Sequence, residues 1–234
     1  MVGSRAVFVF ATVYSVETLR TSPDARMLEP WIFDLDGTLA DSSEGILESM
    51  EVALESCGFP MLVRDPKRLI GPNLPISVSI ANPHLCPESI GRVVSAYREY
   101  YNATGHRKST LYPGVSETLQ RLAASGRDLY ILTNKIQLAA EIIARHLGLD
   151  ACVDHIYGQD AAERPKPDRL MALIQNHRLH SGVLVGDGLD DYAAAQKAGF
   201  RFLLAKWGYG APAVEEKHGP VEGVDRVEEI LRLV

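Results

Sequence analysis

The chain has 234 residues, which suits one sizeable hydrophobic core and a smaller second unit. Its 24 Lys and Arg against 30 Asp and Glu give a formal charge of −6 without any basic stripe, so we expect no nucleic-acid partner. The three cysteines form no C-x-x-C pair, which argues against a disulfide framework and a zinc site and favours a cytoplasmic protein.

The first 26 residues stand apart from the rest. Arg5 precedes an apolar run from Ala6 to Val16, which resembles a short signal sequence but is too short to span a bilayer. No small-residue cleavage pattern follows, and Met27 lies just before the first strong motif. We therefore expect residues 1–26 to be a disordered extension or to precede the native start, and we expect no membrane partner.

A buried strand and then a helical region are predicted next. Trp31-Ile32-Phe33 is an apolar run that ends abruptly at Asp34, which is typical of a strand entering a loop. Two amphipathic helices are predicted over 43–57 and about 88–103, on either side of a proline-rich stretch. No convincing strand is predicted between residues 41 and 110. We expect a small helical cap over 43–110.

From Tyr112 onward the predicted helices and strands alternate. The helices are expected over 115–124, 137–147, 168–177 and 190–198 and at the C-terminus, and the strands over 128–132, 155–157, 183–185 and 200–205. Such alternation implies parallel strands joined by right-handed crossovers. We therefore expect an α/β core, a doubly wound, mostly parallel, Rossmann-like sheet formed by residues 27–42 and 111–234. The helical cap is inserted after its first strand.

The motif Asp34-Leu35-Asp36-Gly37-Thr38 places two carboxylates where a strand opens into a loop. Like charges this close resist joint ionisation, which a cation or a retained proton relieves, so the pair can supply a nucleophile and a general acid. A plain surface turn explains this motif equally well when it is taken alone.

Three further polar motifs follow at the ends of later elements. They are Thr133-Asn134, Lys166 between two prolines, and a carboxylate cluster that contains Asp187, Asp190 and Asp191. A helix N-cap explains Thr133-Asn134, and a solvated loop explains Lys166, when each is taken singly. Because the carboxyl ends of parallel strands meet at the edge where this fold binds ligands, the four together indicate one site.

These residues resemble the four motifs of the haloacid dehalogenase superfamily: Asp34-x-Asp36-Gly37-Thr38, Thr133, Lys166, and Gly186-Asp187-x-x-x-Asp191. The resemblance runs from Trp31 to the C-terminus. The helical insertion, with Ile70-Gly71-Pro72 and Tyr97-Arg98-x-Tyr100-Tyr101, resembles the small cap of the phosphoglycolate phosphatase-like branch.

The resemblance implies a magnesium-dependent phosphatase that acts on a small organic phosphate ester. Asp34 would be the nucleophile and Asp36 the general acid and base. Other roles are implied for further residues: Mg²⁺ would be held by Asp34, the Asp36 carbonyl and Asp187, with Asp191 as an outer acceptor, and the phosphate would contact Gly37, Thr133, Asn134 and Lys166.

Several alternatives stay open. A phosphosugar mutase uses the same motifs, and a pyrophosphatase or nucleotidase would differ only in the cap. A non-catalytic scaffold on this fold is a further alternative, although it predicts the loss of a charged motif residue. The loop around Arg68 and Gly71 is expected to contact the leaving group. Met50, Tyr97 and Tyr101 are expected to serve packing, Asp190 to cap a helix, and the protein to be a monomer or homodimer.

Overall fold

The computed structural model describes residues 28–159 and 161–234, so the prediction for residues 1–26 lies outside the described residues. Its main sheet has six parallel strands in the order β5-β4-β1-β6-β7-β8. They are β1 (Trp31–Phe33), β4 (Leu129–Ile136), β5 (His155–Gln159), β6 (Val183–Gly186), β7 (Arg201–Ala205) and β8 (Gly223–Val224). Because β1 lies at the centre and later strands add on both sides, the predicted doubly wound sheet is confirmed.

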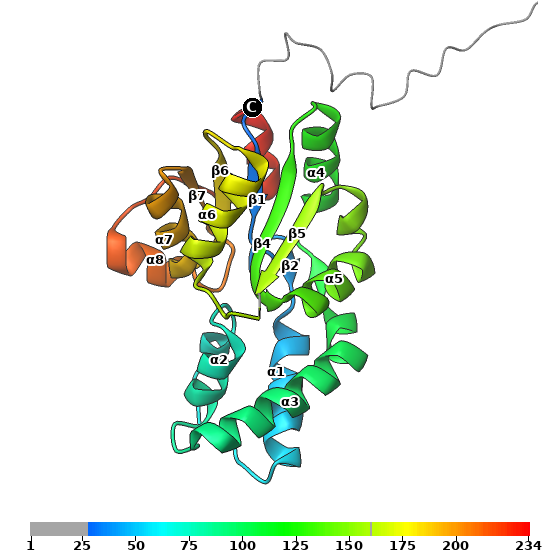
Figure 1. The fold of residues 1–234 in the computed structure, drawn as a ribbon, viewed down its shortest axis with the longest axis vertical. Coiled ribbons are helices and arrows are strands. Elements are labelled where there is room, and N and C mark those ends of the chain that lie inside the picture. The colour runs from blue at the N-terminus through cyan, green and yellow to red at the C-terminus, as the bar shows by residue number, and fades with distance from the viewer. Residues whose placement is uncertain (1–27, 160) are drawn as a thin grey trace, which may run out of the picture.

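Helices cover both faces of this sheet (Figure 1). They are α4 (Val115–Ala124), α5 (Gln137–His146), α6 (Lys166–His177), α7 (Leu189–Ala198) and α8 (Ala211–His218). Alternate strand residues point to opposite faces, so Trp31 and Phe33 pack in one core cluster with α4 and α5, while Ile32 packs in another with α6, α7 and α8. β1 is consequently buried on both faces.

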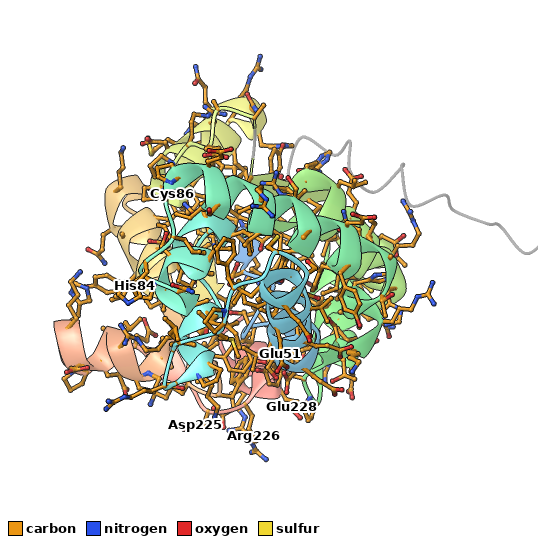
Figure 2. All side chains as sticks on the ribbon, turned by 90° about the horizontal axis from the view of Figure 1, so that it is seen from below. Glu51, His84, Cys86, Asp225, Arg226 and Glu228 are labelled. Atoms are coloured by element: carbon orange, nitrogen blue, oxygen red, sulfur yellow. The ribbon has the colours of Figure 1, made fainter. Side chains whose placement is uncertain are left out.

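The first three α-helices after β1 form a separate layer. They are α1 (Ser43–Ser56), α2 (Leu74–Ala81) and α3 (Pro87–Ala103). Met50, Val93 and Tyr101 belong to a hydrophobic cluster formed almost wholly within this layer. Figure 1 shows the three helices at the lower end of the molecule, and Figure 2 looks onto them, with Glu51 on α1 and His84 and Cys86 between α2 and α3. We call residues 42–109 the cap; the domain division at 43–110 stays a prediction.

The chain enters and leaves the cap through a two-stranded antiparallel ribbon, β2 (Ala40–Asp41) and β3 (Thr110–Leu111). β2 ends at Asp41 and β3 begins at Thr110, so both lie at the ends of the region 41–110, in which no strand is predicted. Helix α2 lies in the proline-rich stretch, where no helix is predicted. It forms because Pro75 occupies the first turn, where no N–H is needed, and because the side chain of Asn73 accepts a hydrogen bond from the Ile76 N–H at 3.2 Å.

The C-terminal region differs from the single predicted helix. It contains α8, the edge strand β8 and a 3₁₀ helix, η5 (Val227–Arg232), which packs against α4 through Ile230. The three cysteines are free thiols, in agreement with the absence of a predicted disulfide framework. No helix in the described part of the chain combines the length and the apolar character needed to cross a bilayer.

Candidate active site

The loop after β1 carries the first two carboxylates of the site. The Asp34 N–H donates to the Val185 carbonyl of β6 at 2.9 Å, which fixes the loop where the strands end. Asp34 and Asp36 are only 6% and 8% exposed. The backbone turns at Gly37 with φ +82°, and a Cβ there would lie 2.4 Å from Oδ2 of Asp187. Only glycine therefore lets the loop approach Asp187 so closely.

Lys166 holds two carboxylates together. Its Nζ donates to Oδ1 of Asp34 at 2.7 Å and to Oδ1 of Asp191 at 2.5 Å, and all three side chains are buried. The second oxygen of Asp191 accepts from the Gly188 N–H at 3.0 Å at the start of α7. Burial lowers the pKa of Lys166, but the charges of Asp191 and Asp34 outweigh burial and the net shift is upward. The lysine is therefore held as an ammonium.

Asp187 lies beside this cluster at the end of β6. Its Oδ2 accepts from the Gly210 N–H at 2.8 Å, and Gly208 packs so closely that a Cβ there would lie 2.1 Å from the Asp187 Cβ. Burial, together with the charge of Asp191, raises the pKa of Asp187 to about 7. A buried acid with so few compensating charges is a favourable position for a cation.

Asp34, Asp187 and Asp191 can each place one oxygen within 4.8 Å of the other two. Burial raises the pKa of Asp34 well above its ordinary value, and Asp191 and Asp187 raise it further, although Lys166 lowers it. Three acids with one ammonium leave excess negative charge, and their hard oxygen donors suit Mg²⁺. Both oxygens of Asp191 accept short hydrogen bonds, from Lys166 at 2.5 Å and from the Gly188 N–H at 3.0 Å. Asp187 accepts from the Gly210 N–H at 2.8 Å and only distantly, at 3.4 Å, from the Thr38 hydroxyl, so its Oδ1 is the more available for a metal.

Thr133 and Asn134 lie on β4, which continues past the expected end at Leu132. Thr133 is buried, and both residues line a cavity together with Asp34 and Asp36. The Asn134 Nδ2 donates to the Gly71 carbonyl of the cap and to Oδ2 of Asp190, each at 3.0 Å. The side chain of Asn134 therefore connects the cap with α7 across the site.

The expected helix-capping role of Asp190 is wrong. Gly188 is the N-cap of α7, and the carboxylate of Asp191, not that of Asp190, accepts its N–H. Asp190 instead accepts a hydrogen bond from the Asn134 side chain of β4 at 3.0 Å.

Two cations of the site, the largely buried Lys135 and the buried Arg169, were not predicted from the sequence. Lys135 lies 3.1 Å from Oδ2 of Asp36, and its Nζ lies 4.3 Å from the centre of the Tyr101 ring. Arg169 donates to the Thr133 carbonyl at 2.7 Å and to the Asn134 Oδ1 at 2.6 Å. The position of Lys135 directly after Thr133-Asn134 was the only sequence signal for it, and nothing distinguished Arg169 from other helical arginines.

Asp36 is turned away from the Lys166 cluster. Its Oδ1 accepts from the Ser42 hydroxyl, and its Oδ2 pairs with Lys135. Burial lowers the pKa of Lys135, but the charge of Asp36 and the contacts with Tyr101 and Tyr97 outweigh burial, so the net shift is upward. The two carboxylates of the loop thus have separate cationic partners.

Two cavities meet at Asp34. The inner cavity has a volume of about 80 Å³ and lies between the core and helices α1 and α3 of the cap; Met50, Tyr97 and Tyr101 line it as well as packing in the cap. The outer cavity, of about 440 Å³, borders Lys166 and Asp187. Of the loop expected to meet the leaving group, Gly71 lines both cavities and Arg68 only the outer one.

Comparison with known proteins agrees with this geometry. A family described as "Haloacid dehalogenase-like hydrolase" matches residues 31–205. A phosphoglycolate phosphatase of Vibrio vulnificus is 34% identical over 190 residues, which cover 76% of this chain and 83% of the relative. A 5'-nucleotidase of Pseudomonas aeruginosa is 31% identical over 204 residues, covering 84% and 91%.

A solved structure of a haloacid dehalogenase-like hydrolase from Streptococcus pneumoniae superposes with a TM-score of 0.79 at 30% identity. It covers 88% of this chain and 97% of that one. The matched family residues include the β1 loop, Thr133, Lys166 and Asp187, which the fold brings together around one site. This chain therefore belongs to the haloacid dehalogenase-like hydrolase family, as a phosphatase of its phosphoglycolate phosphatase-like branch.

Proposed function

We propose that this protein is a Mg²⁺-dependent phosphomonoesterase that hydrolyses a small, phosphoglycolate-like ester through a phosphorylated Asp34. The observation that carries the proposal is the buried cluster in which Lys166 bridges Asp34 and Asp191 next to Asp187. A carboxylate nucleophile beside a fixed cation, at the mouth of two cavities, is suited to attack on an anionic phosphate.

In the first step, an oxygen of Asp34 attacks phosphorus and the bond from phosphorus to the ester oxygen breaks. Lys166 already holds Oδ1 of Asp34, so the other oxygen is the one that we expect to attack. Asp36 gives a proton to the departing alkoxide. For this to happen, the Asp36 carboxylate has to leave its contacts with Ser42 and Lys135 and turn toward the cavity that it lines.

In the second step, water attacks the phosphorus of the aspartyl-phosphate while Asp36 takes its proton, and the bond from phosphorus to Asp34 breaks. Phosphate leaves and Asp34 is regenerated. Thr133, the Asn134 N–H, Lys166 and the backbone at Gly37 are the proposed contacts of the phosphoryl oxygens, where positive charge and N–H donors stabilise the negative charge of the transition state.

The residues of the cluster fit a bound Mg²⁺. Asp34, Asp187 and the Asp36 carbonyl would hold it, while Asp191, which receives two donors from the protein, orients Lys166. When bound, the ion would neutralise charge on the phosphate as a Lewis acid.

A nucleoside monophosphate is the second candidate substrate. The 31% identity to a 5'-nucleotidase and the outer cavity of about 440 Å³ support it. A phosphosugar mutase reaction stays an alternative from the sequence. The cytoplasmic location and the monomeric or homodimeric state stay predictions.

The test is phosphate release by purified protein with and without Mg²⁺. The substrates are phosphoglycolate, pyrophosphate, sugar phosphates and nucleoside monophosphates, with Asp34→Asn as the control. Release from one preferred ester, only with Mg²⁺ and not by the variant, would support the proposal. Release from none of them, together with isomerisation of a sugar phosphate primed by a bisphosphate, would replace it with the mutase.

A further inference from the structure

One wall of the inner cavity is a single face of α3. Four side chains of this helix line the cavity at helical spacing: Tyr97, Arg98, Tyr101 and Asn102. The two tyrosines also pack in the cap, with stacked rings 5.6 Å apart. Arg98 and Asn102 add a guanidinium and an amide to this wall, whose other two side chains are tyrosines.

Arg98 has no protein partner within residues 28–159 and 161–234. Its Nε is shielded from solvent and forms no hydrogen bond, and its guanidinium forms no ion pair with a described carboxylate. A guanidinium offers five donors, and leaving a buried donor without an acceptor is costly. That cost is accounted for if a ligand in the cavity supplies the acceptor.

The other charges of the inner cavity are arranged differently. Lys135 is paired with Asp36. Glu163 reaches the cavity but is exposed and forms no ion pair with Arg98 in the described chain. Arg98 is therefore the cation of this cavity that the described residues leave unpaired, and it lies on the cap side, while Asp34 and Asp36 lie on the core side.

The size of the inner cavity limits what lies next to Arg98. At roughly 15 Å³ for each water-sized group, a cavity of about 80 Å³ has room for about five non-hydrogen atoms. The alkoxide of a two-carbon hydroxy acid, with its carboxylate, is of this size. A nucleoside is several times larger.

We propose that Arg98 binds the carboxylate of the leaving group, and that this one side chain sets the preference of the site for an ester with an acidic leaving group over a neutral one. This rests on the proposed function, because only phosphate transfer from an ester produces a leaving group. A planar guanidinium matches a carboxylate through two parallel hydrogen bonds. Asn102, one turn further along α3, supplies an amide for a remaining oxygen.

The test compares phosphoglycolate with 2-hydroxyethyl phosphate, which has the same chain length but a hydroxymethyl group in place of the carboxylate. Wild-type protein is expected to prefer phosphoglycolate in kcat/KM. Arg98→Met is expected to reduce this preference roughly 10- to 100-fold, as for a lost hydrogen bond to a charged group. Arg98→Lys keeps the positive charge but not the two parallel N–H donors, so it is expected to retain part of the preference for phosphoglycolate.

The matched control is Arg92→Met, which removes an exposed arginine from the same helix and is expected to leave the preference unchanged. If Arg98→Met lowers kcat/KM for both esters equally, Arg98 has only a structural role and the inference is wrong. Thermal denaturation checks that the variants are folded. If Arg98→Met is unfolded, Arg98→Lys alone is used for the test.

Two other results would also overturn the inference. If Glu163→Gln reproduces the effect of Arg98→Met on both esters, Arg98 joins the cap to the core instead of binding substrate. If a nucleoside monophosphate is the better substrate and Arg68→Met, not Arg98→Met, weakens its turnover, the leaving group lies in the outer cavity. Absence of release from every ester would instead remove the proposed function, and the inference with it.

Discussion

Two lysines, the buried Lys166 and the largely buried Lys135, contact the two carboxylates of the β1 loop, and they differ in what surrounds them. Lys166 lies 2.7 Å from Asp34 and 2.5 Å from Asp191, and all three residues belong to the core. Lys135 lies 3.1 Å from Asp36, but its ammonium also faces the ring of Tyr101 on α3 of the cap at 4.3 Å.

This difference in surroundings separates the proposed role of nucleophile from the proposed role of acid and base. The charged partners of the proposed nucleophile, Asp34, all come from the core, so this ion pairing does not depend on where the cap lies. The surroundings of the proposed acid and base, Asp36, include a cap residue through Lys135. We therefore expect changes in the cap to affect proton transfer more than nucleophile activation.

Replacing the two carboxylates one at a time is expected to give the largest effects. Asp34→Asn removes the nucleophile and should lower kcat by on the order of 10⁴-fold or more. Asp36→Asn keeps the nucleophile and should cost about 10²- to 10⁴-fold, the usual range for an acid or base. Phosphate release measures both, with circular dichroism as the control for folding. Equal losses in the two variants would contradict the division of roles.

Lys166→Met is expected to be the most destabilising change in the core site. It leaves the buried carboxylates of Asp34 and Asp191 without their shared cation, which costs about 3–5 kcal/mol of unfolding free energy. Urea denaturation measures the change. Lys197→Met is the matched control, because Lys197 pairs with Asp168 on the surface, where such pairs contribute at most about 1 kcal/mol. Similar losses in both variants would argue against a buried ion pair.

Mg²⁺ is expected to stabilise the folded protein through the core site only. At a concentration a hundredfold above Kd, binding to the native state adds about 2.7 kcal/mol, which appears as a rise in Tm. Asp187→Asn should abolish this rise. Asp190→Asn should keep it, because Asp190 contacts Asn134 and lies outside the carboxylate cluster. A rise that survives in Asp187→Asn would contradict the assignment of Asp187.

The smallest expected effect is on the cap side of the Lys135 pair. Tyr101→Leu removes the ring face from the ammonium, an interaction of about 0.5–2 kcal/mol, so we expect kcat to fall between about twofold and thirtyfold. Tyr101→Phe keeps the ring and should retain most of the activity. The measurements are kcat and the Mg²⁺-dependent rise in Tm. In Tyr101→Leu, kcat should fall while the rise in Tm stays unchanged, because Tyr101 lies next to Lys135 and not in the carboxylate cluster.

The core could be predicted because its signals are local. Apolar runs such as Val183-Leu184-Val185 predicted buried strands, and helix α4 has the predicted bounds Val115–Ala124. β4 extends to Ile136, beyond the predicted end at Leu132, because Asn134 and Lys135 continue the strand with polar side chains that no apolar run could reveal. The candidate site residues at strand ends could be predicted for the same reason.

The cap and the residues that link it to the core were harder to predict. α2 was missed because it lies in a proline-rich stretch without a clear helical pattern, although Pro75 occupies the first turn, where helices tolerate proline. Lys135 was missed because its partners, Asp36 and Tyr101, come from distant segments that only the folded chain brings together. Arg98 stood in a motif of the cap, but its lack of a partner is a property of the three-dimensional structure.

The β2–β3 ribbon has a mechanical consequence. Both passages of the chain between core and cap are paired, with Ala40 opposite Leu111 and Asp41 opposite Thr110. Two hydrogen-bonded connections side by side form a hinge. We therefore expect the cap to rotate relative to the core about one axis. Arg98, Tyr101 and the Gly71 loop would then move together. Opening of the cap to admit a substrate would also move Tyr101 away from Lys135, the partner of Asp36.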